Sequence, residues 1–445
     1  MTTKRVALLQ LLKSKEPKRI YKLDTLPGDI LGFIATFLSQ RHYAHFECLN
    51  STIYIGINDN SKSSKLTSLK ATYDDWSHQQ ILEILKWHKN LQQLDINSDY
   101  LYLFKSCNDK FEFKKLKKLN IIITEKTDDG FFEFINLQKF CDYTQLTSLG
   151  LWGIRSFDIS LMYKAISMCC NLKNFEVSDC YESNSVKLEL PHLQYLKLYS
   201  SLAFEIIKSS GHQLKQLKYW NTEAWAFENS FYENTQRVKI LNKINFEKLL
   251  KLKIDSVYFN EIEAIVKSAK NLEYLYMTNE GYIYPAGSQQ TIKNLVEVIF
   301  TKCTKLVHIC LNFMLERHSS MEELLRDCNS PLLGYTGLIT GLEQTVSVQR
   351  EQLQIDMIQG MLSLKQLGEI MNIFKKGNTK TMIIYYSKGT IFHNDYLLED
   401  SIDEPMKFVE NVIKQSLTDS SLYSYSFNNV KENGLEFQLT LQKKI

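Results

Sequence analysis

Residue types with catalytic or metal-binding chemistry occur in this sequence, but not at the spacings that such chemistry needs. The nine cysteines include no C-x-x-C pair, and the nine histidines are scattered. His42 and His45 lie three residues apart, but a zinc ion needs further ligands nearby, and none is evident. Phosphate-loop, dinucleotide, zinc-protease and serine-hydrolase motifs do not occur. The sequence therefore predicts no catalytic residue, no metal and no cofactor. Enzymatic activity would require a site that the fold assembles from residues outside any known motif.

Aromatic and lysine side chains indicate a different chemistry, the binding of a protein. Aromatic rings supply a large contact area with few rotatable bonds, so they are common at the centres of interfaces. Several lie beside regularly spaced leucines, and we expect them on one surface that binds a protein target: Trp152, Tyr195, Tyr199, Trp220, Tyr274 and Tyr276. Four lysines among them favour an acidic target segment: Lys197, Lys218, Lys251 and Lys253. An alternative is that the C-terminal tail or the loops between repeats fold back over these rings.

The elements that position these residues are repeats. The pattern Leu-x-x-Leu-x-apolar occurs ten times, with spacings between successive starts from 21 residues (Leu193 to Leu214) to 35 residues (Leu214 to Leu249). The pattern begins at Leu66, Leu91, Leu116, Leu146, Leu172, Leu193, Leu214, Leu249, Leu272 and Leu306, and the ninth and tenth copies end in Met277 and Leu311. Ten such matches predict an array of stacked repeats.

Each repeat is expected to contain one short strand and one helix. Alternation around the leucines makes a strand whose leucines face the core and whose other residues face the opposite side. The segments 79–88 and 159–168 have apolar residues at helical spacing. On the surface opposite the leucines, the early repeats carry small or charged residues: Ser68, Lys70, Gln93, Asp95, Lys118 and Asn120. The sequence thus predicts an α/β solenoid with strands on its concave face and helices on its convex face.

Residues 21–60 form a separate N-terminal module in this prediction. An apolar stripe at helical spacing runs through the segment, preceded by Leu26-Pro27 near a helix start. Such a small module leaves an apolar face uncovered, which suits binding in the groove of a partner. The residues expected to contact that partner are Leu26, Pro27, Ile30, Leu31, Ile34 and Leu38. The other interpretation is a helical cap on the repeats.

The chain resembles F-box proteins that carry leucine-rich repeats. The opening of the F-box motif is met by Leu26-Pro27, Asp29, Ile30-Leu31, Ile34 and Phe37-Leu38, whereas its basic residue and tryptophan near 49–54 are missing. The repeats are similar to the cysteine-containing subtype, best seen in Cys170 to Cys180, where two cysteines bracket the strand. We expect those cysteines to be small buried thiols that pack in the core. The resemblance implies a right-handed solenoid after the F-box module.

The resemblance also implies a function. The chain would be the substrate-recognition subunit of an SCF-type cullin-RING ubiquitin ligase, binding an Skp-type adaptor and cullin complex through residues 21–60. Its concave face would hold the protein target close to the conjugating enzyme. The alternative is a repeat scaffold or inhibitor with no ligase association.

Composition and the remaining segments complete the prediction. With 53 Lys+Arg and 50 Asp+Glu, the net charge of +3 gives no general attraction to nucleic acid or membrane. Glycine and proline are scarce, at 17 and 6, which disfavours a turn-rich β-sandwich. Residues 1–20 are expected to be a basic flexible tail, 61–345 the repeats, and 346–445 degenerate repeats or a C-terminal cap. Without a signal-like or membrane-spanning segment, we expect a cytoplasmic or nuclear protein.

Overall fold

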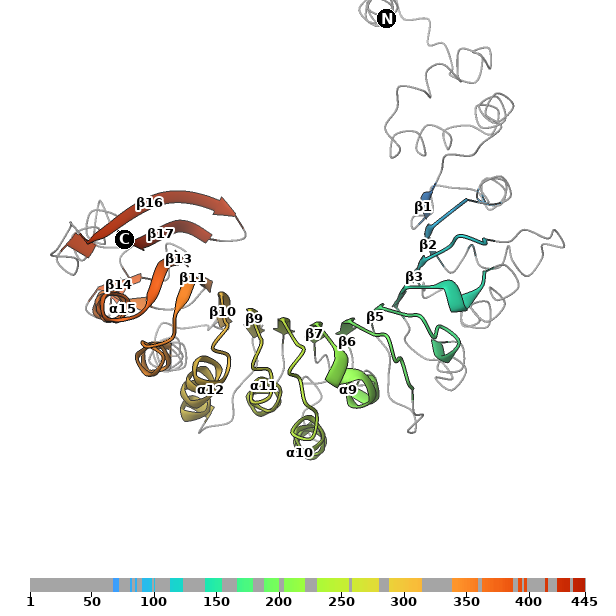
Figure 1. The fold of residues 1–445 in the computed structure, drawn as a ribbon, viewed down its shortest axis with the longest axis horizontal. Coiled ribbons are helices and arrows are strands. Elements are labelled where there is room, and N and C mark those ends of the chain that lie inside the picture. Colours follow the sequence, from blue (N-terminus) through green and yellow to red (C-terminus); the bar gives the residue numbers. More distant parts are fainter. Residues whose placement is uncertain are drawn as a thin grey trace, which may run out of the picture.

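A computed structural model of the chain describes residues 67–71, 81, 85, 90–97, 100, 113–122, 141–153, 166–178, 188–199, 204–220, 230–255, 258–279, 288–313, 338–358, 362–386, 391–393, 396–397, 413–414, 422–432 and 435–444. These residues form an open α/β arc that resembles a leucine-rich-repeat solenoid (Figure 1). Strands line its inner side and helices its outer side. The predicted F-box module, residues 21–60, lies outside the described residues.

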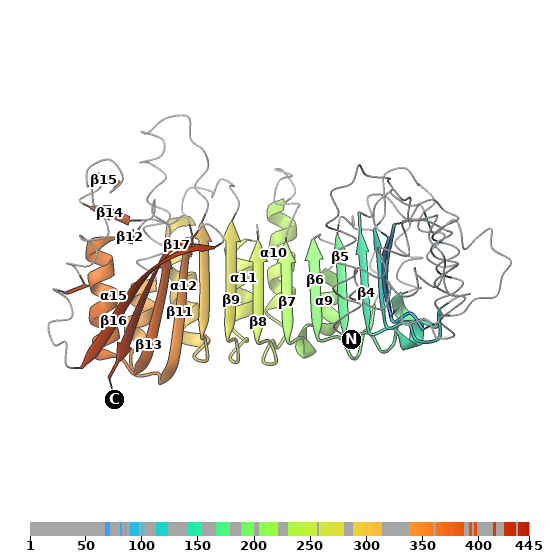
Figure 2. The same cartoon turned by 90° about the horizontal axis from the view of Figure 1, so that it is seen from above.

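Each of the ten leucine patterns forms a strand that begins two residues after the first leucine of the pattern. The strands are β1 (Ser68–Ala71), β2 (Gln93–Asn97), β3 (Lys118–Ile122), β4 (Ser148–Trp152), β5 (Asn174–Ser178), β6 (Tyr195–Tyr199), β7 (Gln216–Trp220), β8 (Lys251–Asp255), β9 (Tyr274–Asn279) and β10 (His308–Phe313). They pair in parallel and in sequence order, and Figure 2 shows many of them side by side. The predicted long parallel sheet is confirmed.

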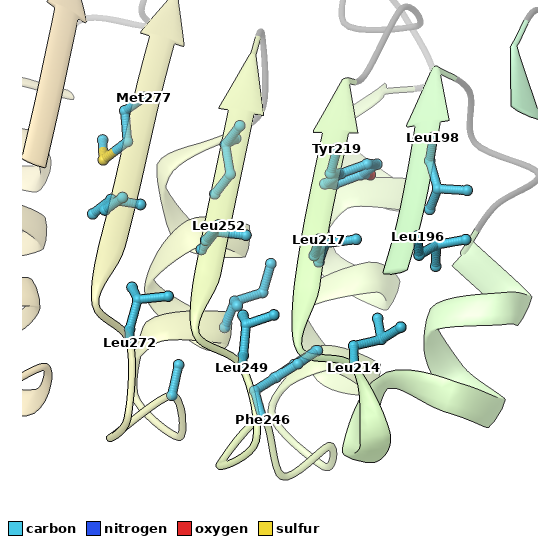
Figure 3. Close-up of a cluster of buried hydrophobic side chains, with 14 of the residues drawn as sticks. Leu196, Leu198, Leu214, Leu217, Tyr219, Phe246, Leu249, Leu252, Leu272 and Met277 are labelled. Atoms are coloured by element: carbon cyan, nitrogen blue, oxygen red, sulfur yellow. The ribbon is translucent and has the colours of Figure 1, made fainter. Parts of the chain in front are cut away.

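Alternation along each strand separates the core from the concave face. In β8, Leu252 and Ile254 are 2% and 1% exposed, whereas Lys251 and Lys253 point to the other side. The parallel register aligns Leu252 with Leu217 of β7 and Leu275 of β9, so the leucines stack into one continuous core (Figure 3). Truncating such a leucine to alanine would cost roughly 2–5 kcal/mol.

A tight turn before each of the strands β3 to β10 adds a second layer to this core. The residue three positions before the first leucine accepts a hydrogen bond from the leucine N–H, and its side chain is buried. Residues of very different size occupy this inward-facing position. It is occupied by Phe113, Tyr143, Cys169, Leu190, Gly211, Phe246, Ala269 and Cys303.

This turn corrects one prediction about the cysteines. Cys170 was expected to be buried, but it is exposed, and its neighbour Cys169 is buried instead. The reason is that Cys169 occupies the inward position of the turn, three residues before Leu172. Cys303 holds the equivalent place before Leu306, so buried thiols do occur in this array, one residue earlier than predicted in the case of Cys169.

One core position on β7 is polar and brings a buried ion pair with it. Tyr219 lies where the other patterns have an apolar, non-aromatic residue, and its hydroxyl donates to Glu261 Oε2 at 3.2 Å. Arg237 Nε donates to Glu261 Oε1 at 2.9 Å. Burial raises the pKa of the Glu261 carboxyl, and the Arg237 charge opposes that rise. The three side chains satisfy one another in the core, so the cluster is structural.

Helices cover the outer side of the sheet. They include α9 (Phe204–Ser210), α10 (Ser230–Leu241), α11 (Phe259–Val266), α12 (Ser288–Lys302) and α15 (Leu364–Lys376), with short 3-10 turns η4 (Tyr143–Gln145) and η6 (Gly211–Gln213). In α11, buried residues recur at Ile262, Ile265 and Val266, so one face packs on the strands. Of the helix expected at 79–88, the described residues Ile81 and Leu85 are helical and buried.

Beyond β10 the sheet continues and then changes direction. β11 (Arg350–Ile358) and β13 (Thr379–Tyr386) are parallel to β10, with α15 between them in sequence. β17 (Leu435–Lys443) then pairs antiparallel with β13, and β16 (Tyr423–Glu432) forms a hairpin with it. A small second sheet joins β12 (Leu362–Ser363), β14 (Ile391–His393) and β15 (Tyr396–Leu397). Leu439 and Leu441 of β17 are buried, so this hairpin covers the end of the repeat core.

Candidate partner-binding face

The concave face carries three lysines in one row across neighbouring strands. Lys197 on β6 aligns with Lys218 on β7, and Lys218 aligns with Lys253 on β8. We call these three residues the lysine row. The row exists because each lysine holds the same place in its repeat, between the two inward residues of the strand.

The aromatic residues predicted to bind a target lie around this row. Trp152 ends β4, Tyr195 begins β6, Trp220 ends β7, and Tyr274 and Tyr276 belong to β9. Tyr274 is 39% exposed, whereas the other four side chains are half-buried. Tyr199 is the last residue of β6, and its side chain is outside the described set. The fold therefore brings five of the six predicted side chains onto one face.

Each ammonium group of the row lies against at least one of these rings. The Lys197 Nζ is 4.3 Å from the centre of the Trp152 ring, and the Lys218 Nζ is 5.6 Å from the Tyr195 ring. The Lys253 Nζ lies between two rings, 5.4 Å from Trp220 and 4.3 Å from Tyr276.

Lys251, on β8 but outside the row, packs on Tyr274 at 4.7 Å. Such cation–π contacts hold the charges in place, and they explain why most of the rings are half-buried instead of fully exposed.

The positive charge of the row is only partly balanced. Glu176 on β5 forms a salt bridge of 3.4 Å with Lys197. Among the described residues, no carboxylate lies within 4.0 Å of the ammonium groups of Lys218 or Lys253. Partial burial lowers the pKa of Lys218, and the neighbouring charges of Lys197 and Lys253 lower it further, against an opposing effect from Glu176. The middle of the row is thus a site where an anion would relieve repulsion.

The carboxylates elsewhere on the concave face accept hydrogen bonds from other side chains of that face. Asp95 accepts from Asn120 Nδ2 at 2.7 Å, and Asp255 accepts from Trp220 Nε1 at 2.6 Å. Asp356 on β11 accepts from His308 Nε2 at 2.7 Å. Motif searching did not single out Asp255, Glu176, His308 or Asp356. Their positions in the repeat, facing away from the leucines, would have placed them on this face.

The early strands present the short and charged side chains that were expected. Ser68, Lys70 and Lys118 are exposed, while Gln93 and Asn120 are half-buried beside Asp95. Gly150 on β4 has no room for a side chain, since a Cβ there would lie 2.3 Å from Asn120 Oδ1 and 3.1 Å from Trp152 Nε1. The absence of a side chain at Gly150 therefore lets the Trp152 ring fold towards the backbone of its own strand.

Buried thiols in the part of the chain that the structure describes are not activated as nucleophiles. Burial raises the pKa of the Cys141, Cys169 and Cys303 thiols to about 12, so these thiols stay protonated at neutral pH. Cys310 lies on the concave face but is 1% exposed, packed under Tyr276 and Tyr385, and burial raises its pKa as well. Within the described residues, no three histidine, cysteine or acidic side chains gather as metal ligands would.

No protein-family model matches the chain, and no curated protein matches it. Among solved structures, the chain is similar to the functional domain of InlJ from Listeria monocytogenes, which includes a cysteine ladder. The two are 12% identical, and the alignment covers 88% of this chain and 82% of that domain with a TM-score of 0.20. A superposition this poor adds nothing to the fold described above. Over the described residues, none of the helices combines the length and the apolar character needed to cross a membrane.

Proposed function

We propose that this chain is a non-catalytic, protein-binding adaptor whose concave face holds an acidic segment of a target protein. The observation that carries the proposal is the lysine row, in which Lys218 and Lys253 pack on aromatic rings and have no carboxylate partner among the described residues. Fixed, partly desolvated cations attract a partner of opposite charge and exclude a partner of like charge. The surrounding rings supply contact area for the same partner.

The test of this face removes one aromatic ring at a time. Each of the substitutions Trp220→Ala and Tyr276→Ala should lower target affinity by about 2 kcal/mol. The variant loses the contact between its ring and the target, and it also loses one of the two rings on which Lys253 packs. Affinity would be measured by titration calorimetry with a target captured by the full chain. A control substitution must not disturb the core, which excludes Tyr143→Ala because the Tyr143 side chain is buried there. Exposed Met168 is suitable, and Met168→Ala should leave affinity unchanged. Wild-type affinity in both ring variants would contradict the proposal.

The proposal includes a second partner, bound by residues 21–60. The F-box resemblance at Leu26-Pro27, Ile30-Leu31 and Ile34 supports the binding of an Skp-type adaptor, and through it a cullin-RING ubiquitin ligase. The cysteine-containing repeat subtype and a right-handed solenoid belong to the same proposal. The chain would act in the cytoplasm or nucleus, and the thiols of Cys141, Cys169 and Cys303, which are not joined in disulfides, are compatible with a reducing compartment.

Co-purification with an Skp-type adaptor tests the ligase connection. Ile34→Asp and Leu31→Asp should abolish binding, because each would place a charge in an apolar groove. Ser39→Asp is the matched control, since it adds the same charge opposite the apolar stripe of the same expected helix. Circular dichroism must show that the repeats are intact in all three variants. If Leu31→Asp co-purifies as well as wild type, the chain is a repeat scaffold without ligase association, which is the alternative function.

A further inference from the structure

We propose that Arg350 anchors a second anion-binding site, which takes the carboxylate or phosphate group of a small molecule. Arg350 is the first residue of β11, and the register aligns it with Thr379, the first residue of β13. This site goes beyond the proposed function, because it lies on strands outside the lysine row and uses none of its residues.

The Arg350 side chain is buried without a partner. The residue is 7% exposed, and neither its Nε nor its Nη2 has a hydrogen-bond acceptor among the described residues. Burial lowers the pKa of the guanidinium, but an arginine side chain still keeps its proton at neutral pH. Because a buried charge without an acceptor is costly, the chain gains stability from any anion that reaches this group.

Two other cations close to the core are satisfied by the chain itself. Arg237 Nε donates to the buried carboxylate of Glu261 at 2.9 Å. The half-buried Lys443 Nζ donates to the backbone carbonyls of Lys375, at 3.3 Å, and of Gly377. Arg350 is as deeply buried as Arg237 and has neither kind of acceptor among the described residues. The contrast supports an acceptor that is supplied by a ligand.

The two unsatisfied nitrogen atoms of Arg350 define the chemistry of that ligand. The Nε–H and one Nη2–H point in parallel from the same edge of the planar guanidinium. This pair of donors fits two oxygens that belong to one carboxylate or one phosphate group. A halide ion or a single carbonyl oxygen cannot match both donors in this way. The geometry therefore favours an oxyanion held by two parallel hydrogen bonds.

The backbone next to Arg350 is tied to the neighbouring strand. The Asn378 N–H donates to the carbonyl of Val346 at 2.9 Å, and Asn378 Nδ2 donates to the carbonyl of Ser347 at 3.0 Å. These bonds join the segments that lead into β11 and β13, so they hold the start of β11 on the sheet. With only 7% of Arg350 exposed, a small terminal group can reach the guanidinium more easily than a side chain on the surface of a folded partner.

Inorganic phosphate and acetate are the probes that test this site on the full chain. Each would be compared with sodium chloride at equal ionic strength. The Nε–H signal of Arg350 would be followed by NMR after labelling arginine with nitrogen-15, and the signal is identified by its loss in Arg350→Met. We expect a saturable shift of this signal. A shift with phosphate alone assigns a phosphate group, and a shift with acetate alone assigns a carboxylate. A signal that responds to neither probe would overturn the site.

Substitutions of Arg350 provide a second readout, the midpoint of urea unfolding. The bound anion should raise the midpoint of the wild type, whereas Arg350→Met should lose this response. Arg350→Lys keeps the charge but not the parallel donors, so it should bind the anion at least about ten-fold more weakly. Without added anion, Arg350→Met should unfold at no lower urea concentration than the wild type, because it removes a buried charge. A markedly lower midpoint would mean that the chain itself satisfies Arg350, which contradicts the proposal.

Two further variants exclude other origins of the response. Lys380→Met removes a positive charge one residue from Thr379, but this lysine already pairs with Glu351 at 2.9 Å, so the response should remain. Lys218→Gln removes the centre of the lysine row and should also keep it. Loss of the response in Lys218→Gln would move the anion to the lysine row and overturn the site at Arg350. An equal rise of the midpoint in all variants, including Arg350→Met, would be a general salt effect and would overturn it too.

Discussion

The flanking strands and the middle strands of the concave face differ in how their charges are balanced. On β2 and β3, Asp95 accepts hydrogen bonds from Asn120 and Gln93, and on β10 and β11, Asp356 accepts from His308 and Gln354. On β6, β7 and β8, three lysines stand side by side with one carboxylate, Glu176, in contact with the first. The carboxylates on the flanking strands thus accept hydrogen bonds from neighbouring side chains of the same face. On the middle strands, only the first of the three lysines has a carboxylate partner among the described residues.

The difference in charge balance has opposite consequences for the stability of the sheet and for the binding of a partner. Like charges that face each other on neighbouring strands lower the stability of a sheet, so the lysine row opposes folding slightly. Cation–π contacts with Tyr195 and Tyr276 offset part of that cost but cannot neutralise the charge. An anionic partner would neutralise it. This is why we propose that the partner binds at the middle strands and that the polar networks on either side are structural.

The largest expected effect comes from reversing the central charge of the row. Lys218→Glu should weaken binding of an acidic partner by about 100-fold, through loss of one attraction and gain of one repulsion. The free energy of unfolding should stay the same or rise by a few tenths of a kcal/mol, about what a cross-strand pair contributes, since the new carboxylate lies between Lys197 and Lys253. Peptide titration and urea unfolding measure the two quantities.

The control for this variant is a lysine that holds the same place in its repeat on a flanking strand. Lys70 on β1 is exposed and aligned with Asp95 of β2, at the far end of the sheet. Lys70→Glu makes the same charge change far from the proposed site, so it should alter affinity by less than about two-fold. If Lys70→Glu weakens binding as strongly as Lys218→Glu does, the attraction is a property of overall charge and the comparison between regions is wrong.

The sequence was sufficient to predict the strands, because a parallel sheet with one buried face requires apolar residues at fixed places. Leu217 and Leu252 satisfy that requirement, and the same alternation put Lys218, Lys253 and Trp220 on the opposite face. The contacts between these side chains could not be predicted from one strand alone.

Those contacts depend on register and rotamers across repeats of unequal length. Lys197 lies over the ring of Trp152, which belongs to a strand two places away in the sheet. The hydrogen bond between His308 and Asp356 joins residues 48 apart in sequence. The inward turn position was also missed, since it accepts residues as different as Gly211 and Phe246 and so leaves no compositional signal.

A smaller effect is expected at the boundary between the early strands and the aromatic cluster. Gly150→Ala should lower the free energy of unfolding by about 1–3 kcal/mol, because the new Cβ would overlap Asn120 Oδ1. Asn120 cannot move away freely, since its amide donates to Asp95. Urea unfolding followed by tryptophan fluorescence measures the change. In the Asn120→Ala background the same substitution should cost less, and strictly additive losses would show that the overlap is not the cause.

On the other flank, removal of a satisfied carboxylate should affect stability alone. Asp356→Ala leaves His308 and Gln354 without their common acceptor and should cost about 1–2 kcal/mol of unfolding free energy. Affinity for an acidic peptide should change by less than about two-fold, because Asp356 lies on β11, three strands from Lys253 on β8. Peptide titration would reveal an affinity gain of ten-fold or more, and such a gain would mean that the flanking carboxylates repel the partner.

The smallest effect is a pH dependence that belongs to the middle strands. The folded chain lowers the pKa of Lys218 below its ordinary 10.5, first through desolvation and then through Lys197 and Lys253. Between the lowered pKa and 10.5 the unfolded chain binds more protons than the folded chain, so the unfolding free energy should rise with pH across that window. Affinity for an acidic partner should move in the opposite direction, since the partner requires the charged form of Lys218.

Peptide titrations from about pH 8 upward would follow that loss, which should begin below the range where an unperturbed lysine titrates. Lys218→Arg keeps a positive charge throughout this range, so its affinity should fall less steeply with pH than that of the wild type. An identical pH profile for wild type and Lys218→Arg would mean that Lys218 is not the central contact, and the partner would then be held by the two ends of the row.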